Sequence, residues 1–267
     1  MKSFALLDEW PCESVAAAVI APSGEVHRHG DTTQVFALAS ITKLLTAAAV
    51  HLAVEEGSVT LDHEVDERGT TMADLLAHAG GLAPNGKVLD DPGRRRIYSN
   101  AGYEMAAAAV EASAGLTFAD YLHEGIFSPL AMGSSALLTS PAFGAESTVD
   151  DLVRFVQHLP ELLDPTTLGL MVSAHLPELI GVLPGYGRQA PNTWGLGPEI
   201  RAEKSPHWTG HTNSPSTWGH FGQTGTFLWV DPEVMVTCIV LTNHAFDEWA
   251  KPLWPAFSDA VRAELLR

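Results

Sequence analysis

The sequence predicts an α/β (α+β) protein whose antiparallel sheet is built from both ends of the chain and flanked by helices. Apolar, β-branched runs typical of strands occur near the start, at residues 15–20, and near the end, at residues 227–241. The stretch between them has mainly helical patterns. We therefore expect a sheet domain formed by residues 1–66 and 190–267, and a mainly helical domain inserted at residues 67–189.

The first expected elements are a hairpin and a helix. The apolar run at residues 15–20 leads into the turn signal Ala21-Pro22-Ser23-Gly24, so residues 25–29 are expected to return as a second strand. Apolar residues then dominate from Phe36 to Val50, which predicts a helix buried on nearly all sides. Gly57 is well placed to end this helix.

Further helices are expected in the middle of the chain, after which the sheet resumes. Helical patterns cover residues 71–77, 100–113, 117–128 and 147–159. Between them, Arg94 to Arg96 have the composition of a solvated loop. Residues 173–217 are rich in Gly, Pro, Asn and His, which predicts loops. Strands follow at residues 227–230 and 234–241, and an amphipathic helix is expected at residues 258–266.

The composition excludes several classes of protein. A net charge of −17 argues against nucleic acid and anionic membranes as partners. Cys12 and Cys238 fit no metal or redox spacing, so we expect two structural thiols. Residues 1–10 lack an apolar core of signal-peptide length, and no run reaches transmembrane length without a charge or a turn residue. We therefore expect a cytoplasmic protein.

The twelve histidines do not predict a metal site. His207 and His211 are four residues apart, but proline and glycine nearby disfavour a helical pair of ligands. His27 and His29 share one face of an expected strand without an evident third ligand. The glycines are too sparse for a phosphate-binding loop. We expect neither a metal nor a cofactor.

Ser40 and Lys43 are the first candidates for chemistry. Three residues apart, they share one face of the expected helix. Burial lowers the pKa of a lysine towards the range of a useful base, and a serine becomes a nucleophile when a neighbouring base takes its proton. Because the same spacing also arises by chance, the pair needs support from the rest of the chain.

Two further stretches carry suitable groups. Tyr98-Ser99-Asn100 begins the alanine-rich helix, where a tyrosine hydroxyl can transfer a proton and an asparagine can bind an amide or ester. Residues 218–226 contain three glycines before a strand, which lets a ligand lie against backbone amides. Within them, His220 offers positive charge or hydrogen bonds. Each stretch alone is also compatible with a purely structural role.

Taken in order, the three stretches resemble the active-site motifs of the serine β-lactamase and penicillin-binding-protein superfamily. The similarity is closest to the branch of class C β-lactamases, serine esterases and D-aminopeptidase-like hydrolases. It covers nearly the whole chain from about Val15. The resemblance implies a β-lactamase-like fold.

The resemblance also implies roles for individual residues. Ser40 matches the nucleophile, Lys43 its basic partner, and Tyr98 the tyrosine that assists proton transfer. Asn100 matches the asparagine that holds the acyl-side amide in relatives with amide substrates. His220 matches the first position of the third motif, where lysine or histidine occurs.

Substrate binding is further assigned to Phe221, Gly222 and Gln223. The family's oxyanion hole corresponds to the backbone amides of Ser40 and Gln223. Phe221 departs from the family, which usually has Thr or Ser at this position to bind a substrate carboxylate. The chain is also short for the family. An alternative register makes Gln223-Thr224-Gly225 the third motif; we prefer the first register because Thr-Gly-Thr before an apolar strand is typical of the esterase branch.

These features predict a serine hydrolase that acts through an acyl-enzyme on a small ester or amide, with a carboxylesterase-like activity in first place. Acyl transferase, amidase or peptidase, and β-lactamase activities stay open, as does a non-catalytic acyl-binding or sensor module. Trp194, Trp208 and Trp218 are expected near the cleft with Phe221. Such aromatic residues favour a neutral, partly apolar substrate over penicillins. The sequence leaves the oligomeric state open.

Overall fold

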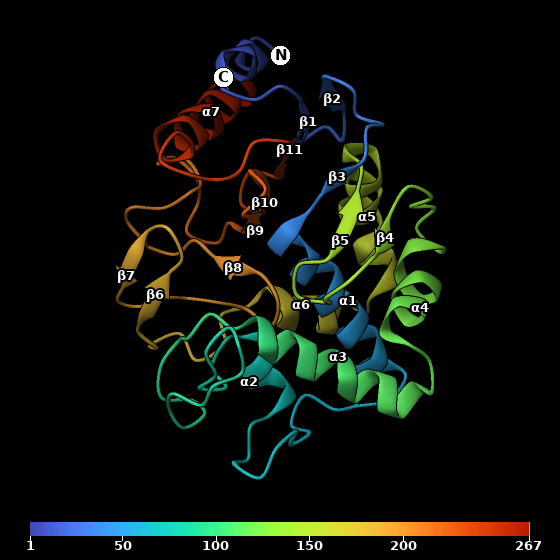
Figure 1. Ribbon diagram of the computed structural model, residues 1–267. Coiled ribbons are helices and arrows are strands. Elements are labelled where there is room, and N and C mark those ends of the chain that lie inside the picture. The colour runs from blue at the N-terminus through green and yellow to red at the C-terminus, as the bar shows by residue number, and fades with distance from the viewer. Residues whose placement is uncertain (267) are drawn as a thin grey trace.

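The computed structural model describes residues 1–266, and its centre is a six-stranded antiparallel sheet (Figure 1). The strand order is β2 (Val26–His29), β1 (Val15–Ile20), β11 (Val236–Thr242), β10 (Thr226–Asp231), β9 (Trp218–Gly222) and β8 (Glu199–Ile200). In the pairing of β1 with β11, Ala18 lies opposite Ile239. The predicted α/β (α+β) fold, with one sheet joining strands from both ends of the chain, is confirmed.

Alternate residues of the strands face two separate cores. In β1 and β11, the larger core contains Ala16, Ala18, Ile239 and Leu241, and the smaller core contains Ala17, Val19, Cys238 and Val240. Every residue of β11 is buried. This explains its nearly continuous apolar sequence, because a strand covered on both faces has no solvent side.

Helices η1 (Ser3–Glu9) and α7 (Ala250–Leu265) cover the face of the smaller core and bring the two ends of the chain together (Figure 1). The carboxylate of Glu264 accepts hydrogen bonds from the amides of Lys2 and Ser3 at 2.7 and 2.8 Å. The sequence patterns did not predict η1, and the expected start of the last helix at residue 258 was wrong. Prolines at residues 252 and 255 read as helix breakers, yet the helix contains them.

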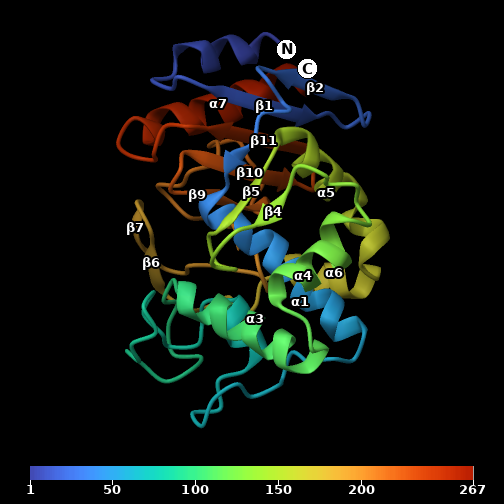
Figure 2. The same cartoon turned by 45° about the vertical axis from the view of Figure 1, so that its right-hand side comes forward.

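The helices of the middle of the chain lie on the opposite side of the sheet, some of them directly against its strands and the others behind these (Figure 2). These are α1 (Thr42–Glu55), α2 (Met72–Leu76), α3 (Asn100–Ala114), α4 (Phe118–Leu122), the π-helix η3 (His123–Phe127), α5 (Val149–Leu162) and α6 (Pro165–Val172). Side-chain hydroxyls cap several of them; Thr71 forms a capping box with Asp74 at the start of α2. The predicted helices are confirmed, and α6 was missed.

Helix α1 runs through the larger core, and every residue from Thr42 to His51 is buried. The prediction of a helix from Phe36 onward was wrong in its first turns. Phe36–Ala37 is the short strand β3, and a 3₁₀ turn, η2 (Ala39–Ile41), precedes α1. Ala39 has a φ of 46°, which lies outside the helical region and keeps this turn separate from the helix.

The remaining strands are short. Strand β3 pairs with β5 (Ala145–Ser147), which pairs with β4 (Ala136–Leu137), and β6 (Gly181–Leu183) forms a hairpin with β7 (Gly187–Gln189). The expected loop region 173–217 is indeed largely irregular. Arg96 is not a solvated loop residue as predicted, because it is 2% exposed and donates to four backbone carbonyls, three of them in this region.

The division into two domains stays a prediction. The larger core contains residues of both proposed parts, for example Leu44 and Tyr103. Within residues 1–266, no helix is both long and apolar enough to cross a membrane.

Candidate active site

The backbone around Ser40 is held tightly against strand β9. Ser40 lies in η2, directly after Ala39 with its left-handed φ of 46°. A Cβ added to Gly222 would lie 2.4 Å from the carbonyl oxygen of Leu38 and 3.1 Å from Cβ of Ala39. Only a glycine at this position of β9 allows the strand to approach the serine turn so closely.

Tyr98 contacts Ser40 directly. Its hydroxyl donates a hydrogen bond to Ser40 Oγ at 2.8 Å. Burial raises the pKa of the Tyr98 hydroxyl above its usual value, so the tyrosine stays protonated. The predicted partnership of residues 40 and 98 is therefore present in the structure, with the tyrosine as the donor.

Lys43 is completely buried beneath the same site. Its Nζ donates to Asn100 Oδ1 and to the carbonyl oxygen of Ala142, both at 2.8 Å, and lies 4.7 Å from the ring centroid of Tyr98. No carboxylate within residues 1–266 forms an ion pair with it. Burial lowers the pKa of Lys43 well below its ordinary value. The structure thus joins Lys43 to Asn100 through a hydrogen bond and offers an amine that is readily neutral.

His78 supports Tyr98 and was missed in the sequence. Its Nδ1 accepts a hydrogen bond from the Ser99 amide at 3.1 Å, and its ring lies 4.5 Å from that of Tyr98. The residue is buried and has a left-handed φ of 57°. The sequence around His78, between a predicted helix and Gly80-Gly81, does not indicate this contact, because Tyr98 is 20 residues away in the chain.

His220 and Phe221 lie on β9 with their side chains on opposite faces of the sheet. His220 Nδ1 is 2.7 Å from the Phe221 carbonyl oxygen, and burial lowers the pKa of His220 to about 3. Of the two roles predicted for His220, positive charge or hydrogen bonds, only hydrogen bonding is therefore available near neutral pH. Phe221 packs in the smaller core, with its ring centroid 5.0 Å from that of Phe246.

The two backbone amides expected to form an oxyanion hole are free. In the described part of the chain, the amides of Ser40 and Gln223 donate no hydrogen bond to another backbone or side-chain group. Gln223 is instead fixed through its side chain, whose Nε2 donates to the Phe246 carbonyl at 2.9 Å, and through its carbonyl, which accepts from the Phe246 amide. Two free amides beside a serine can stabilise an oxyanion.

A cavity of about 200 Å³ brings the predicted residues together. It is lined by Ser40, Tyr98, Asn100, Leu183, Pro184, Trp194, Glu199, His220, Phe221 and Gln223. Lys43 lies beneath it, and Gly222 lies in the strand beside it. Of the expected tryptophans only Trp194 lines the cavity; Trp208 lies behind Phe221, and Trp218 belongs to the larger core.

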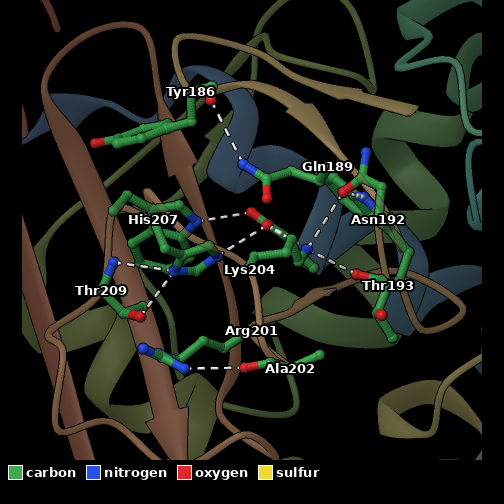
Figure 3. Close-up of polar contacts among 12 residues, drawn as sticks. Tyr186, Gln189, Asn192, Thr193, Arg201, Ala202, Lys204, His207 and Thr209 are labelled. Atoms are coloured by element: carbon green, nitrogen blue, oxygen red, sulfur yellow. Dashed lines mark hydrogen bonds and ion pairs between the residues drawn. The ribbon is translucent and has the colours of Figure 1, made fainter. Parts of the chain in front are cut away.

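Glu199 is the second functional candidate that sequence reasoning missed. It is 1% exposed, and its carboxylate accepts hydrogen bonds from Lys204 (2.5 Å), His207 (2.9 Å) and Trp208 (2.7 Å). Figure 3 shows Lys204 and His207, which both belong to the loop between β8 and β9, within this buried cluster. The ion pair lowers the pKa of Glu199, so the carboxylate is charged although it is buried.

No group of three His, Cys, Asp or Glu side chains within residues 1–266 is arranged to hold a metal ion. Cys12 and Cys238 are both free thiols. The hydroxyls of Ser40 and Tyr98, which meet in the cavity, suit acyl transfer to a serine.

Comparison with known proteins agrees with this arrangement. The family model described as Beta-lactamase matches residues 11–258. A crystal structure of a protein named beta-lactamase from Mycobacterium bovis is 48% identical, with a TM-score of 0.96 over 98% of this chain and 99% of that chain.

More distant relatives are similar over part of the chain or in fold alone. Penicillin-binding protein 4* of Bacillus subtilis is 28% identical over 138 residues, which are 39% of this chain and 31% of that protein. The chain thus matches less than a third of the length of this relative. A mutant of simvastatin synthase from Aspergillus terreus is 18% identical with a TM-score of 0.81, covering 99% of this chain and 98% of that chain, which shows a shared fold. The match to residues 11–258 shows that the chain belongs to the Beta-lactamase family, within the serine β-lactamase and penicillin-binding-protein superfamily.

Proposed function

We propose that this serine hydrolase forms an acyl-enzyme on Ser40 and acts on small carboxylesters. The observation that supports this most is the hydrogen bond from Tyr98 to Ser40 Oγ. Beneath it lies the buried Lys43, which forms no ion pair within residues 1–266. A protein that only binds acyl groups has no use for a base and an acid around one serine.

In this proposal Lys43 is the base and Tyr98 is the acid. Ser40 Oγ bonds to the substrate carbonyl carbon, and its proton passes to the neutral amine of Lys43. As the carbon–oxygen bond to the leaving alcohol breaks, Tyr98 gives its proton to the leaving oxygen. Lys43 then returns a proton to Tyr98, and water releases the acyl group by the same steps in reverse. The amides of Ser40 and Gln223 would receive the oxyanion.

The preference for esters without a carboxylate rests on His220 and Phe221. Within the described residues, no lysine or arginine lines the cavity, and His220 is neutral near pH 7. Phe221 offers no hydroxyl where relatives bind a carboxylate. A carboxylate left without such partners costs about 1–3 kcal/mol per lost hydrogen bond.

Acyl transfer to an amine or alcohol is the second candidate. The fold shared with simvastatin synthase makes this worth testing, because water and an acceptor alcohol would use the same acid and base. Peptidase and β-lactamase activities are weaker candidates, since their usual substrates carry a carboxylate.

A labelling and turnover experiment tests this proposal. A fluorophosphonate should add its mass to the peptide that contains Ser40 in the native protein and not in Ser40→Ala. The value of kcat/KM for a short-chain p-nitrophenyl ester should exceed that for a chromogenic cephalosporin. Unchanged turnover in Ser40→Ala would refute the acyl-enzyme, and equal or faster cephalosporin hydrolysis would refute the ester preference.

A further inference from the structure

His220 lines the catalytic cavity, and its buried Nε2 has no hydrogen-bond partner within residues 1–266. His220 is 3% exposed, and its Nδ1 lies 2.7 Å from the carbonyl oxygen of Phe221. Because a carbonyl only accepts, Nδ1 carries the ring proton and Nε2 has only its lone pair. No group within residues 1–266 donates to this nitrogen. Buried polar atoms are normally paired, so a free acceptor in a cavity points to a ligand that donates to it.

Glu199 contributes a second acceptor to the same cavity. Its Oε1 accepts from Lys204 and His207, whereas its Oε2 accepts from Trp208. A carboxylate oxygen can accept two hydrogen bonds, so Oε2 keeps the capacity for one more. Glu199 lines the cavity together with His220.

The basic side chains near Glu199 already form hydrogen bonds within the protein, so they are not available to bind a substrate anion. Lys204 donates its three protons to Glu199, to the Thr193 carbonyl at 2.8 Å and to Asn192 Oδ1 at 3.4 Å (Figure 3). His207 is neutral, because its Nδ1 accepts from the amide of Thr209 at 3.2 Å and its Nε2 donates to Glu199. The group of this cluster that can still bind a substrate is therefore a hydrogen-bond acceptor, the carboxylate of Glu199.

We propose that His220 and Glu199 form an acceptor subsite that binds an ammonium group of the substrate. An ammonium group has three donors and no acceptor, which matches the unpaired Nε2 of His220 and the remaining acceptor capacity of Glu199 Oε2. Its charge also suits a buried carboxylate and a protein with a net charge of −17. This inference rests on the proposed function and names the substrate class: small esters or amides that carry a positively charged amine.

The first test varies one substituent of the substrate. Methyl esters of propanoic acid substituted at carbon 2 with an ammonium, hydroxyl, methyl or carboxylate group have similar sizes, and both enantiomers are used where they exist. Each kcat/KM at pH 7 is divided by the rate of hydrolysis by hydroxide, which removes differences in intrinsic reactivity. We expect the ammonium ester to exceed the methyl ester by about tenfold or more, and the carboxylate ester to be the poorest. Acetates of 2-(dimethylammonio)ethanol and of 3-methylbutanol make the same comparison on the alcohol side.

The second test changes the subsite. In His220→Phe, the ratio of the corrected kcat/KM of the ammonium ester to that of the methyl ester should fall towards one. In His220→Lys, the preference should shift towards the carboxylate ester. His51→Phe is a matched control. His51 is also buried, with one ring nitrogen 2.9 Å from the Leu196 carbonyl and the other without a partner, but it does not line the cavity. This variant should keep the native ratio.

The outcomes separate this inference from the proposed function. Labelling of Ser40 by a fluorophosphonate without any preference for ammonium on either side of the ester overturns the subsite and leaves the hydrolase intact. An equal loss for all four acyl substituents in His220→Phe also overturns it, because His220 would then act in the chemistry and not in recognition. Absence of both labelling and ester turnover refutes the proposed function itself.

Discussion

The Tyr98 hydroxyl donates its proton towards Ser40 Oγ across 2.8 Å, so in the resting site the serine is the acceptor of this pair. A protonated tyrosine in this position cannot remove the serine proton. Burial raises the pKa of the Tyr98 hydroxyl and lowers that of the Lys43 ammonium, which favours a neutral lysine over a tyrosinate. The structure therefore supports a neutral Lys43 as the base.

Lys43→Ala and Tyr98→Phe should each lower kcat/KM for an ester by about 10²–10⁴-fold, because each removes one proton-transfer group. Tyr121→Phe is the matched control, since Tyr121 is buried and donates to Glu56 far from the cavity. Stopped-flow acylation rates check this prediction. An increase in KM with unchanged kcat would show that residues 43 and 98 only bind substrate.

The pH dependence of acylation should report the protonation of Lys43. Lys43 must be neutral to act, so kcat/KM should rise with pH as Lys43 loses its proton. Because the pKa of Lys43 is lowered, the plateau should be reached well below pH 10.5. In Asn100→Leu the ammonium loses a hydrogen-bond acceptor, which should move the rise to lower pH. A pH–rate profile that does not move in this variant would assign the rise to another group.

Acid should unfold the protein through its buried histidines. The pKa of His220 is about 3 in the folded state and about 6.5 in the unfolded chain, so the unfolded chain binds the extra proton between these values. Stability should therefore fall as pH drops through this window, by about 1.4 kcal/mol per pH unit for one such group. Urea unfolding between pH 7 and 4 measures this slope. The slope should be smaller by about that amount in His220→Phe, and an unchanged slope would contradict the assignment.

Gly222→Ala should damage activity more than its single methyl group suggests. The new Cβ would meet the Leu38 carbonyl and push β9 away from the serine turn, at a cost of about 1–3 kcal/mol in folding free energy and a large fall in kcat. Gly169→Ala in α6 is the control, because nothing lies within 4 Å of its added Cβ. Equal effects of the two substitutions on kcat would show that the approach of β9 is unimportant.

The buried ion pair of Glu199 and Lys204 should show strong coupling in a double-mutant cycle. Glu199→Gln leaves the Lys204 ammonium without its counter-charge and should lower the free energy of unfolding by about 3–5 kcal/mol. Lys204→Met in the same protein should recover part of that loss, because the uncompensated charge is removed. Additive losses, measured by urea unfolding, would indicate that the two charges do not interact.

Much of the fold and of the site could be predicted from the sequence, because both depend on local patterns. Strands such as β1 and β11 are continuous apolar runs, and the residues that cap α2, α3 and α5, namely Thr71, Ser99 and Thr148, lie at or next to the predicted helix starts. Six of the predicted residues line the cavity: Ser40, Tyr98, Asn100, His220, Phe221 and Gln223. Their roles in catalysis and binding stay predictions until tested.

What could not be predicted depends on contacts between distant segments. Glu199, Lys204 and His207 lie in a part of the sequence without periodicity, and only the folded chain shows that they form one cluster. The left-handed Ala39 is also invisible in sequence, because alanine favours the helix that was predicted there. The sequence could not decide whether His220 offers positive charge or hydrogen bonds, because burial, and not residue type, determines its pKa.

The pairing of β1 with β11 has a consequence for synthesis of the protein. Strand β1 ends at residue 20, but its neighbour in the sheet ends at residue 242. During translation one edge of the apolar strand β1 can pair with β2. Its other edge has no partner until β11 has been synthesised. Such long-range pairing slows folding and leaves an open strand edge exposed meanwhile. We therefore expect β1 to be open to wrong pairing until β11 has been synthesised.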